Sequence, residues 1–135
     1  MNTRVEVVFR VVGDFSDATP VTRLFGVTPT EAYGKGDIVG KHPERRHPNG
    51  YWGLASSIGD TAGLNDHLQA VLALLETKRG AIEHVQKEGY ICDIFCGIFS
   101  EDDLEASIVL APEILLGIGR LHLSLNLHSY TGCAN

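Results

Sequence analysis

The stretch between residues 64 and 75 constrains the fold of this sequence more than any other part. Its apolar residues recur at i, i+4, i+7, i+8 and i+11, and they are Leu64, Leu68, Val71, Leu72 and Leu75. This spacing places them on one side of an α-helix and leaves the other side polar. Such a helix is stable in water only when its apolar stripe packs against another element. The rest of the chain must therefore supply a surface that covers this stripe.

Alternating segments can supply that surface as a β-sheet, because every second side chain of a strand points to the same face. Strands are expected at 4–12, 51–57, 90–99 and 121–128, with shorter ones at 38–39 and 106–110. In the last long segment we expect one face to enter the core, formed by Leu121, Leu123, Leu125 and Leu127.

Two shorter helices are expected where a proline opens an apolar stripe and a glycine follows it, near Pro20 and Pro112. A further helix is expected from Thr77 to about Gly89. The order of elements is then β-α-β-β-α-β followed by β-α-β. This order predicts an α/β (α+β) fold, with a ferredoxin-like βαββαβ core and an extra βαβ unit. The sheet is expected to be mixed, with helices mainly on one face.

Length and composition bound the class of protein. The 135 residues fit one compact domain, which we place at 1–135. Eleven basic and seventeen acidic side chains give a net charge of −6, which argues against a nucleic-acid binder because such a protein must neutralise phosphates. Three cysteines cannot all pair, which favours a reducing compartment. The start lacks a signal-peptide core, and the apolar run 108–118 is too short to span a bilayer. We therefore predict a cytoplasmic protein without a membrane partner.

Most of the cysteine, histidine and acidic residues that could form a catalytic or metal site are expected to lie instead in the core, on the surface or in a turn. Cys92 and Cys96 share one strand face with two isoleucines, so we expect them to be buried, reduced and without a metal. We expect four histidines on the solvated surface: His67, His84, His122 and His128. The acidic residues 101–105 lack the spacing of a calcium loop and are expected to form a polar turn. Because no catalytic or phosphate-binding motif stands out, the sequence favours a protein without catalytic residues or a cofactor.

The basic-aromatic loop, residues 33–52, departs from the acidic background. Four of the eleven Lys and Arg side chains lie in it, with two histidines among them and aromatic residues on both sides. Stiffened by prolines, the loop can present these charges to an anion or to an acidic surface. The alternative is a solvated loop whose charges maintain solubility. The candidate ligand-binding or partner-binding residues are Tyr33, Lys35, Asp37, Arg45, Arg46, His47 and Trp52.

Several short motifs resemble a known family. They are Leu-Phe-Gly-Val-Thr-Pro-Thr at 24–30, Tyr33 with Gly36-Asp37, Gly-Tyr-Trp-Gly-Leu at 50–54, the helix at 67–75 and the ending 119–130. In this order and spacing they resemble the domain-of-unknown-function family 4279 over nearly the whole chain. The resemblance implies a small, mainly bacterial domain, and it carries over no catalytic residue. The hallmark positions of the family correspond here to Gly26, Pro29, Gly36, Asp37, Trp52 and Tyr130.

The sequence departs from the family pattern in two places. Tyr33 stands where the family often has Trp, and Asn126 and His128 stand where acidic residues are frequent in the last strand. A role that those acidic residues have elsewhere is therefore not implied for this chain.

Two functions remain open from the sequence. Small size, acidity and the lack of a catalytic set favour a non-catalytic binding or interaction protein, of the regulatory or toxin-neutralising type. The alternative is a small-molecule or anion-binding domain, with or without enzymatic activity, built around the loop 33–52. The expected partner is accordingly a protein or a small anionic ligand, and a homodimer is compatible with either function.

Overall fold

The computed structural model describes residues 3–59, 62–100 and 108–131. One mixed sheet forms the centre of the molecule, with the strand order β2-β5-β1-β6-β7. From one edge to the other these strands are β2 (Glu31–Tyr33), β5 (Gly50–Ala55), β1 (Thr3–Gly13), β6 (Ile91–Ser100) and β7 (Ser124–Thr131). Neighbouring strands are antiparallel except β6 and β7, which are parallel.

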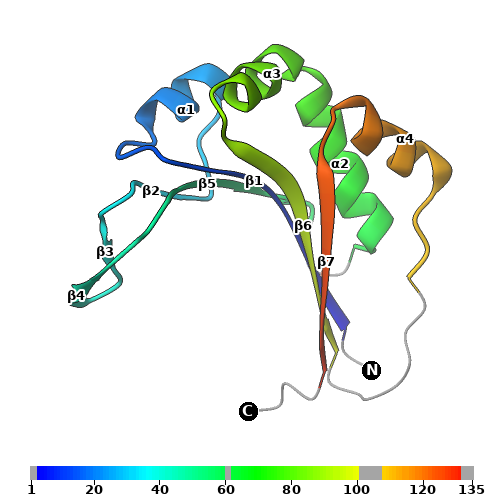
Figure 1. Ribbon diagram of the computed structural model, residues 1–135. Coiled ribbons are helices and arrows are strands. Elements are labelled where there is room, and N and C mark those ends of the chain that lie inside the picture. The colour runs from blue at the N-terminus through cyan, green and yellow to red at the C-terminus, as the bar shows by residue number, and fades with distance from the viewer. Residues whose placement is uncertain (1–2, 60–61, 101–107, 132–135) are drawn as a thin grey trace.

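The helices lie together on one face of this sheet (Figure 1). They are α1 (Thr19–Phe25), α2 (Leu64–Glu76), α3 (Arg79–Lys87) and α4 (Pro112–Arg120). A separate hairpin of β3 (Ile38–Val39) and β4 (His42–Arg46) extends beyond the end of the sheet near β2 and β5 (Figure 1). No helix in the described part of the chain is long and apolar enough to cross a membrane.

The prediction of an α+β fold with a mixed sheet and helices mainly on one face is confirmed, whereas a ferredoxin-like topology is not. The strand expected at 106–110 lies partly outside the described residues, and residues 108–110 form no strand. Two strands that were not predicted lie in this region: β4 within the basic-aromatic loop, and β2, which ends at the first residue of that loop. β2 has three residues and β4 has five, one of them a proline, so the alternation that marks a strand is too brief to detect in them.

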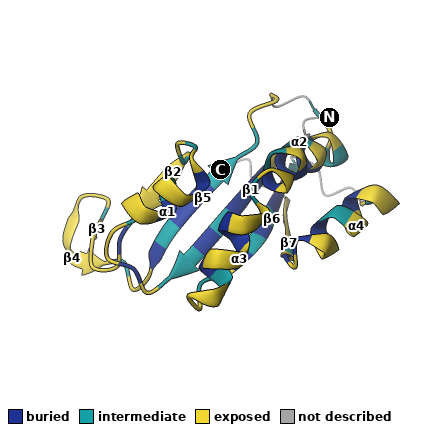
Figure 2. Ribbon diagram, turned by 90° about the horizontal axis from the view of Figure 1, so that it is seen from above, coloured by how far each residue is buried: buried dark blue, intermediate teal, exposed yellow. Residues whose placement is uncertain are grey.

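The core lies between the sheet and the helices (Figure 2). The predicted stripe of α2 is confirmed, because Leu68, Val71, Leu72 and Leu75 are all buried. They pack toward the side of the sheet that carries Phe9 and Ile94, both of which are 0 % exposed. A buried side chain of this size contributes roughly 1.5–3 kcal/mol relative to leaving it in water.

The prediction for the last strand was wrong at both of its ends. Leu121 is buried, but it ends α4 rather than starting β7, which begins only at Ser124. Leu125 is half-buried and Leu127 is 41 % exposed. The physical reason is the place of β7 at the edge of the sheet, where the helical layer covers the beginning of the strand more fully than its end.

Cys92 and Cys96 are buried as predicted, which leads to a test by alkylation. Burial raises the pKa of each thiol to about 12, because the thiolate would lose its hydration. We expect both to react far more slowly with iodoacetamide at pH 8 in the folded protein than in urea, measured by mass spectrometry. Because only the unfolded chain ionises its thiols above about pH 9, their contribution to the free energy of unfolding should fall as the pH rises from 9 toward 12.

Rapid labelling of the two thiols without denaturant would contradict this assignment. Cys133 lies outside the described residues, so the Cys133→Ser variant is the suitable background for the measurement.

Candidate functional site

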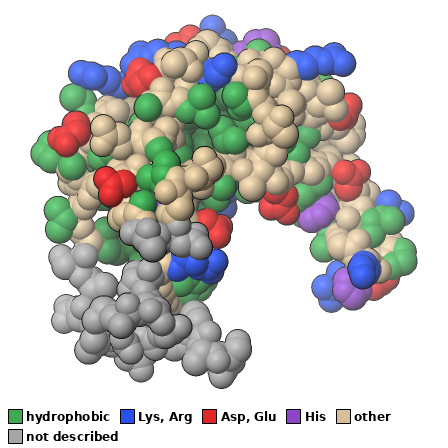
Figure 3. All heavy atoms as spheres, turned by 180° about the vertical axis from the view of Figure 1, so that it is seen from behind, with side chains coloured by type: hydrophobic (Ala, Val, Ile, Leu, Met, Phe, Trp, Pro, Cys, Tyr) green, Lys and Arg blue, Asp and Glu red, His purple; other side chains and the backbone are tan. Residues whose placement is uncertain are grey.

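The face of the sheet that carries no helices, called here the open face, is concave. It forms the underside of the arch in Figure 1, and the space-filling view in Figure 3 shows a hollow there beside the β3–β4 hairpin. Strand alternation places Arg10, Tyr51 and Asp93 on the open face, opposite the side chains that enter the core. This face is therefore a concave surface that the helices leave uncovered.

An ion pair fixes the middle of the open face. Arg10 on β1 donates two hydrogen bonds to the carboxylate of Asp93 on β6, with N–O distances of 2.8 and 2.6 Å. Its guanidinium also lies 4.8 Å from the ring centre of Phe95, within the range of a cation–π contact. The bond to Asp93 raises the pKa of Arg10. The two opposite charges are thus paired with each other within the sheet.

Part of the basic-aromatic loop reaches the open face. The ring of Tyr33 stacks on His47 with the ring centres 3.5 Å apart, and on Tyr51 with the centres 5.2 Å apart. Burial raises the pKa of both tyrosines, and the nearby carboxylate of Glu31 raises it further. Both phenols are therefore neutral at physiological pH, and two of the predicted site residues, Tyr33 and His47, lie in direct contact.

The charged residues of the loop mostly hold its own turns. Lys35 forms an ion pair with Asp14 at 2.6 Å, and Asp37 accepts a hydrogen bond of 2.7 Å from the backbone N–H of Gly34. Arg46 donates to the carbonyl of Gly36 at 3.1 Å. Arg45 is exposed on β4. These contacts explain why the loop folds as it does, but they do not converge on one pocket.

Trp52 lies on the opposite side of the sheet from Tyr51 and is 0 % exposed. Its indole N–H donates to the hydroxyl of Thr22 at 2.9 Å, and its ring stacks on Phe25 with the ring centres 4.9 Å apart. The structure therefore places Trp52 in the core and not with the other predicted site residues. The period of two along β5 accounts for this separation, because adjacent residues of a strand face opposite sides.

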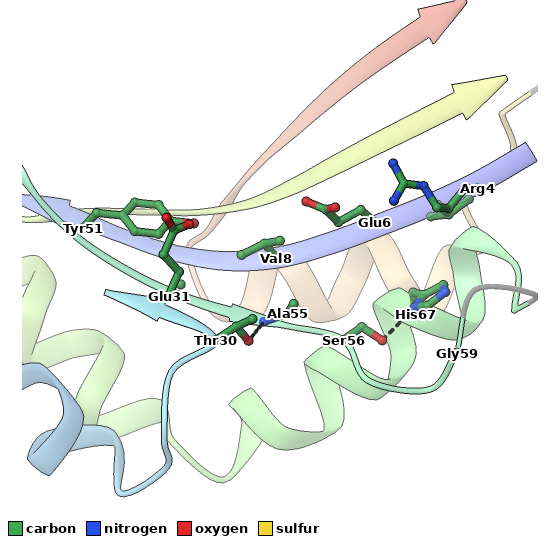
Figure 4. Close-up of a pocket in the computed structure, with 12 residues that line it drawn as sticks. Arg4, Glu6, Val8, Thr30, Glu31, Tyr51, Ala55, Ser56, Gly59 and His67 are labelled. Atoms are coloured by element: carbon green, nitrogen blue, oxygen red, sulfur yellow. Dashed lines mark hydrogen bonds between the residues drawn. The ribbon is translucent and has the colours of Figure 1, made fainter. Parts of the chain in front are cut away.

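A cavity of about 300 Å³ opens where β5 separates from β1 (Figure 4). Its polar lining comes from β1, β2, β5 and α2, and includes Arg4, Glu6, Glu31, Tyr51, Ser56 and His67. The last strand contact on this side joins the amide of Ser56 to the carbonyl of Val7 at 2.8 Å. Alternate residues of a strand direct their backbone N–H and C=O groups to the same side. The N–H and C=O of Val5 therefore point, like those of Val7, into the space between β1 and β5. No strand of the described chain pairs with them there.

His67 is buried, with 3 % exposure, so its expected place on the surface was wrong. Its Nδ1 lies 2.7 Å from the hydroxyl oxygen of Ser56, and within the described chain its Nε2 has no hydrogen-bond partner. A buried polar atom without a partner is rare in folded proteins and costly to leave unsatisfied. The sequence did contain a signal, because position 67 follows Leu64 by three and precedes Val71 by four, on the apolar stripe of the helix.

Two carboxylates at the cavity form no ion pair with the described residues. Neither Glu6 nor Glu31 has a basic partner within 4.0 Å among residues 3–59, 62–100 and 108–131. Neither residue stands out in the sequence, because a single acidic residue in a strand usually marks only the solvated face. Over the same described ranges, no group of three or more His, Cys, Asp or Glu side chains is placed to hold a metal ion.

The Ser56–His67 pair has the residue types of a nucleophile and its base, but not the complete arrangement. A catalytic histidine is oriented by a third group on its other nitrogen. In the described part of the chain no such group contacts the Nε2 of His67. The described residues therefore show two members of such an arrangement and not the third.

The fold and this cavity define a small α+β protein with an open, concave sheet face and a polar cavity at one end of it. The chain belongs to the DUF4279 family, because the family model, described as a domain of unknown function, matches residues 2–132. No curated protein and no solved structure matches the chain. Several hallmark positions have structural roles here, including Gly26, which ends α1 with a φ of 70°, and Trp52 in the core.

Proposed function

We propose that this protein is a non-catalytic binding domain that holds a small molecule in the cavity between Tyr51 and His67. The observation that carries the proposal is His67, which lines the cavity and whose buried Nε2 atom has no hydrogen-bond partner in the described chain. A ligand atom at hydrogen-bond distance would satisfy it and remove the cost of its burial. The volume of about 300 Å³ suits a small ligand.

Three further features support binding at this place. Backbone groups of Val5 face the cavity and can orient a polar ligand. Tyr51 offers an aromatic surface, and its ring lies over Gly53, where any larger residue would displace it. The basic-aromatic loop contributes Tyr33, which stacks on Tyr51 with the ring centres 5.2 Å apart and so supports the aromatic wall of this cavity. Binding of a protein partner and formation of a homodimer stay predictions.

Two substitutions at His67 separate the roles of its nitrogens. In His67→Asn the side-chain amide can replace Nδ1 and keep the contact with Ser56, but nothing replaces Nε2. In His67→Gln the amide reaches the place of Nε2 and the contact with Ser56 is lost. We expect a ligand to stabilise the wild type and His67→Gln, and to have little effect on His67→Asn.

The measurement is a thermal-shift screen of the three proteins against organic cations, organic anions, sugars and nucleosides. A ligand at a hundred times its Kd stabilises a protein by about 2.7 kcal/mol, which raises the Tm of a domain of this size by about 10 °C. The unliganded Tm of each variant is the control for a change in folding. A hit that shifts His67→Asn as much as the wild type, or a library without any hit, would contradict the proposal.

A further inference from the structure

We propose that the ligand of this cavity is a small organic cation, with a primary ammonium or guanidinium group attached to an apolar or aromatic body. This inference rests on the proposed function and adds the chemical class of the ligand. It is carried by four side chains that come from separate elements and line one cavity: two carboxylates without an ion pair in the described chain, the ring of Tyr51, and His67, whose Nε2 has no partner there.

The carboxylates of Glu6 and Glu31 outnumber the one basic side chain of the described lining and give the cavity a net negative charge. Glu6 projects from β1 and Glu31 from the edge strand β2, so they approach the cavity from two elements (Figure 4). Arg4 is the basic residue of the lining, but its guanidinium lies over the ring of Phe99 at 4.4 Å from the ring centre. With this one basic and two acidic side chains, the described lining keeps a net negative charge, which favours a cationic group.

Tyr51 supplies the second element of recognition for a cation. Its ring lies along the sheet over Gly53, and a Cβ atom at that glycine would come within 2.4 Å of the phenol oxygen. The ring is therefore held flat beside the carboxylate of Glu31, as Figure 4 shows. A cationic group near the face of an aromatic ring and next to a carboxylate interacts favourably with both of them. An apolar body attached to it can pack on the same ring.

His67 completes the polar side of the cavity. In the tautomer whose Nδ1–H donates to the hydroxyl of Ser56, the Nε2 atom carries a lone pair and accepts a hydrogen bond. An ammonium or guanidinium group has several N–H donors, so one of them can bond to Nε2 while others bond to a carboxylate. An anionic ligand would instead place its charge against Glu6 and Glu31.

The test uses three probes that share one body and differ in charge: phenethylamine, 2-phenylethanol and phenylacetate. We expect calorimetric titration at low salt to show phenethylamine binding at least tenfold more tightly than 2-phenylethanol, with no binding of phenylacetate. The double variant Glu6→Gln/Glu31→Gln should lose this preference, because the neutral amides keep the shape of the side chains and remove the charge. Glu83→Gln is the matched control, since Glu83 is an exposed residue of α3 on the helical side.

Each outcome has a defined meaning. Loss of the preference in the double variant, with Glu83→Gln unchanged, supports a cation site. Equal or tighter binding of 2-phenylethanol or phenylacetate overturns the ligand class and leaves the cavity as a binding site. Binding of phenethylamine that the double variant retains also overturns the class. Absence of binding by all three probes, together with a thermal-shift screen without a hit, overturns the proposed function itself.

Discussion

The variant Trp52→Ala should lose about 3–5 kcal/mol of unfolding free energy, which is a large part of the stability of a domain this small. Trp52 is 0 % exposed and packs against both Phe9 and Phe25, with ring centres 6.2 and 4.9 Å away. Truncation to alanine removes the buried indole and leaves a cavity that the surrounding rings cannot fill. Guanidinium denaturation followed by circular dichroism measures the loss, since the variant lacks the only tryptophan.

Two variants calibrate this result. Trp52→Phe keeps an aromatic ring but removes the N–H that bonds to Thr22, so a loss of roughly 1–2 kcal/mol is expected. Tyr51→Ala removes the neighbouring ring, which is half-buried on the open face, and should cost less than Trp52→Ala. If Tyr51→Ala were the more damaging of the two, the assignment of faces along β5 would be wrong.

Gly34→Ala should destabilise the protein by on the order of 1–3 kcal/mol or more, through a clash between backbones. A Cβ atom at this position would lie 1.9 Å from the carbonyl oxygen of Ser16, an atom that cannot move without its chain. The same contact region holds the hydrogen bond from the N–H of Lys35 to the carbonyl of Phe15, at 2.8 Å. The added methyl group would therefore separate the basic-aromatic loop from the turn after β1.

Gly80→Ala is the matched control for this substitution. Gly80 lies in α3, and a Cβ there would meet nothing within 4 Å. Alanine favours a helix over glycine by up to about 1 kcal/mol, so this variant should be as stable as the wild type or more stable. Urea denaturation of the two variants side by side gives the comparison. A Gly34→Ala protein with wild-type stability would show that the two backbones are not in close contact.

Periodicity predicted those parts of the fold in which one element has many residues in a regular pattern. The stripe of α2 and the core face of β6 are long enough for the pattern to be unambiguous, and both were confirmed. The beginning of β7 was misplaced because Leu121 and Leu123 continue the alternation of the strand while belonging to the end of α4 and the turn after it. A run of alternating leucines cannot by itself show where a helix ends and a strand begins.

The cavity could not be predicted in the same way, because its residues come from four separate elements. Glu6 and Glu31 meet only through the pairing of β1 with β5 and of β5 with β2. This pairing depends on strand order, which the sequence analysis did not determine. His67 was accessible to sequence reasoning through its place on the helical stripe, but histidine is common on surfaces and was assigned there. The basic residues of the loop 33–52 could be recognised in the sequence as a cluster. Their contacts within the loop could not be predicted from it.

The central place of β1 also determines how the chain can fold while it is being synthesised. Val8 lies opposite Ala55 on one side and Phe95 on the other, so β1 is made long before either neighbour exists. At about 5–20 residues per second, the strand waits on the order of 5–20 s for β6 to leave the ribosome. During that time an apolar strand is prone to aggregate, and charged residues within it oppose this. While β1 has no partner strand, the charge of Arg10 interrupts its apolar run. When β6 pairs with β1, Asp93 neutralises that charge in the finished sheet.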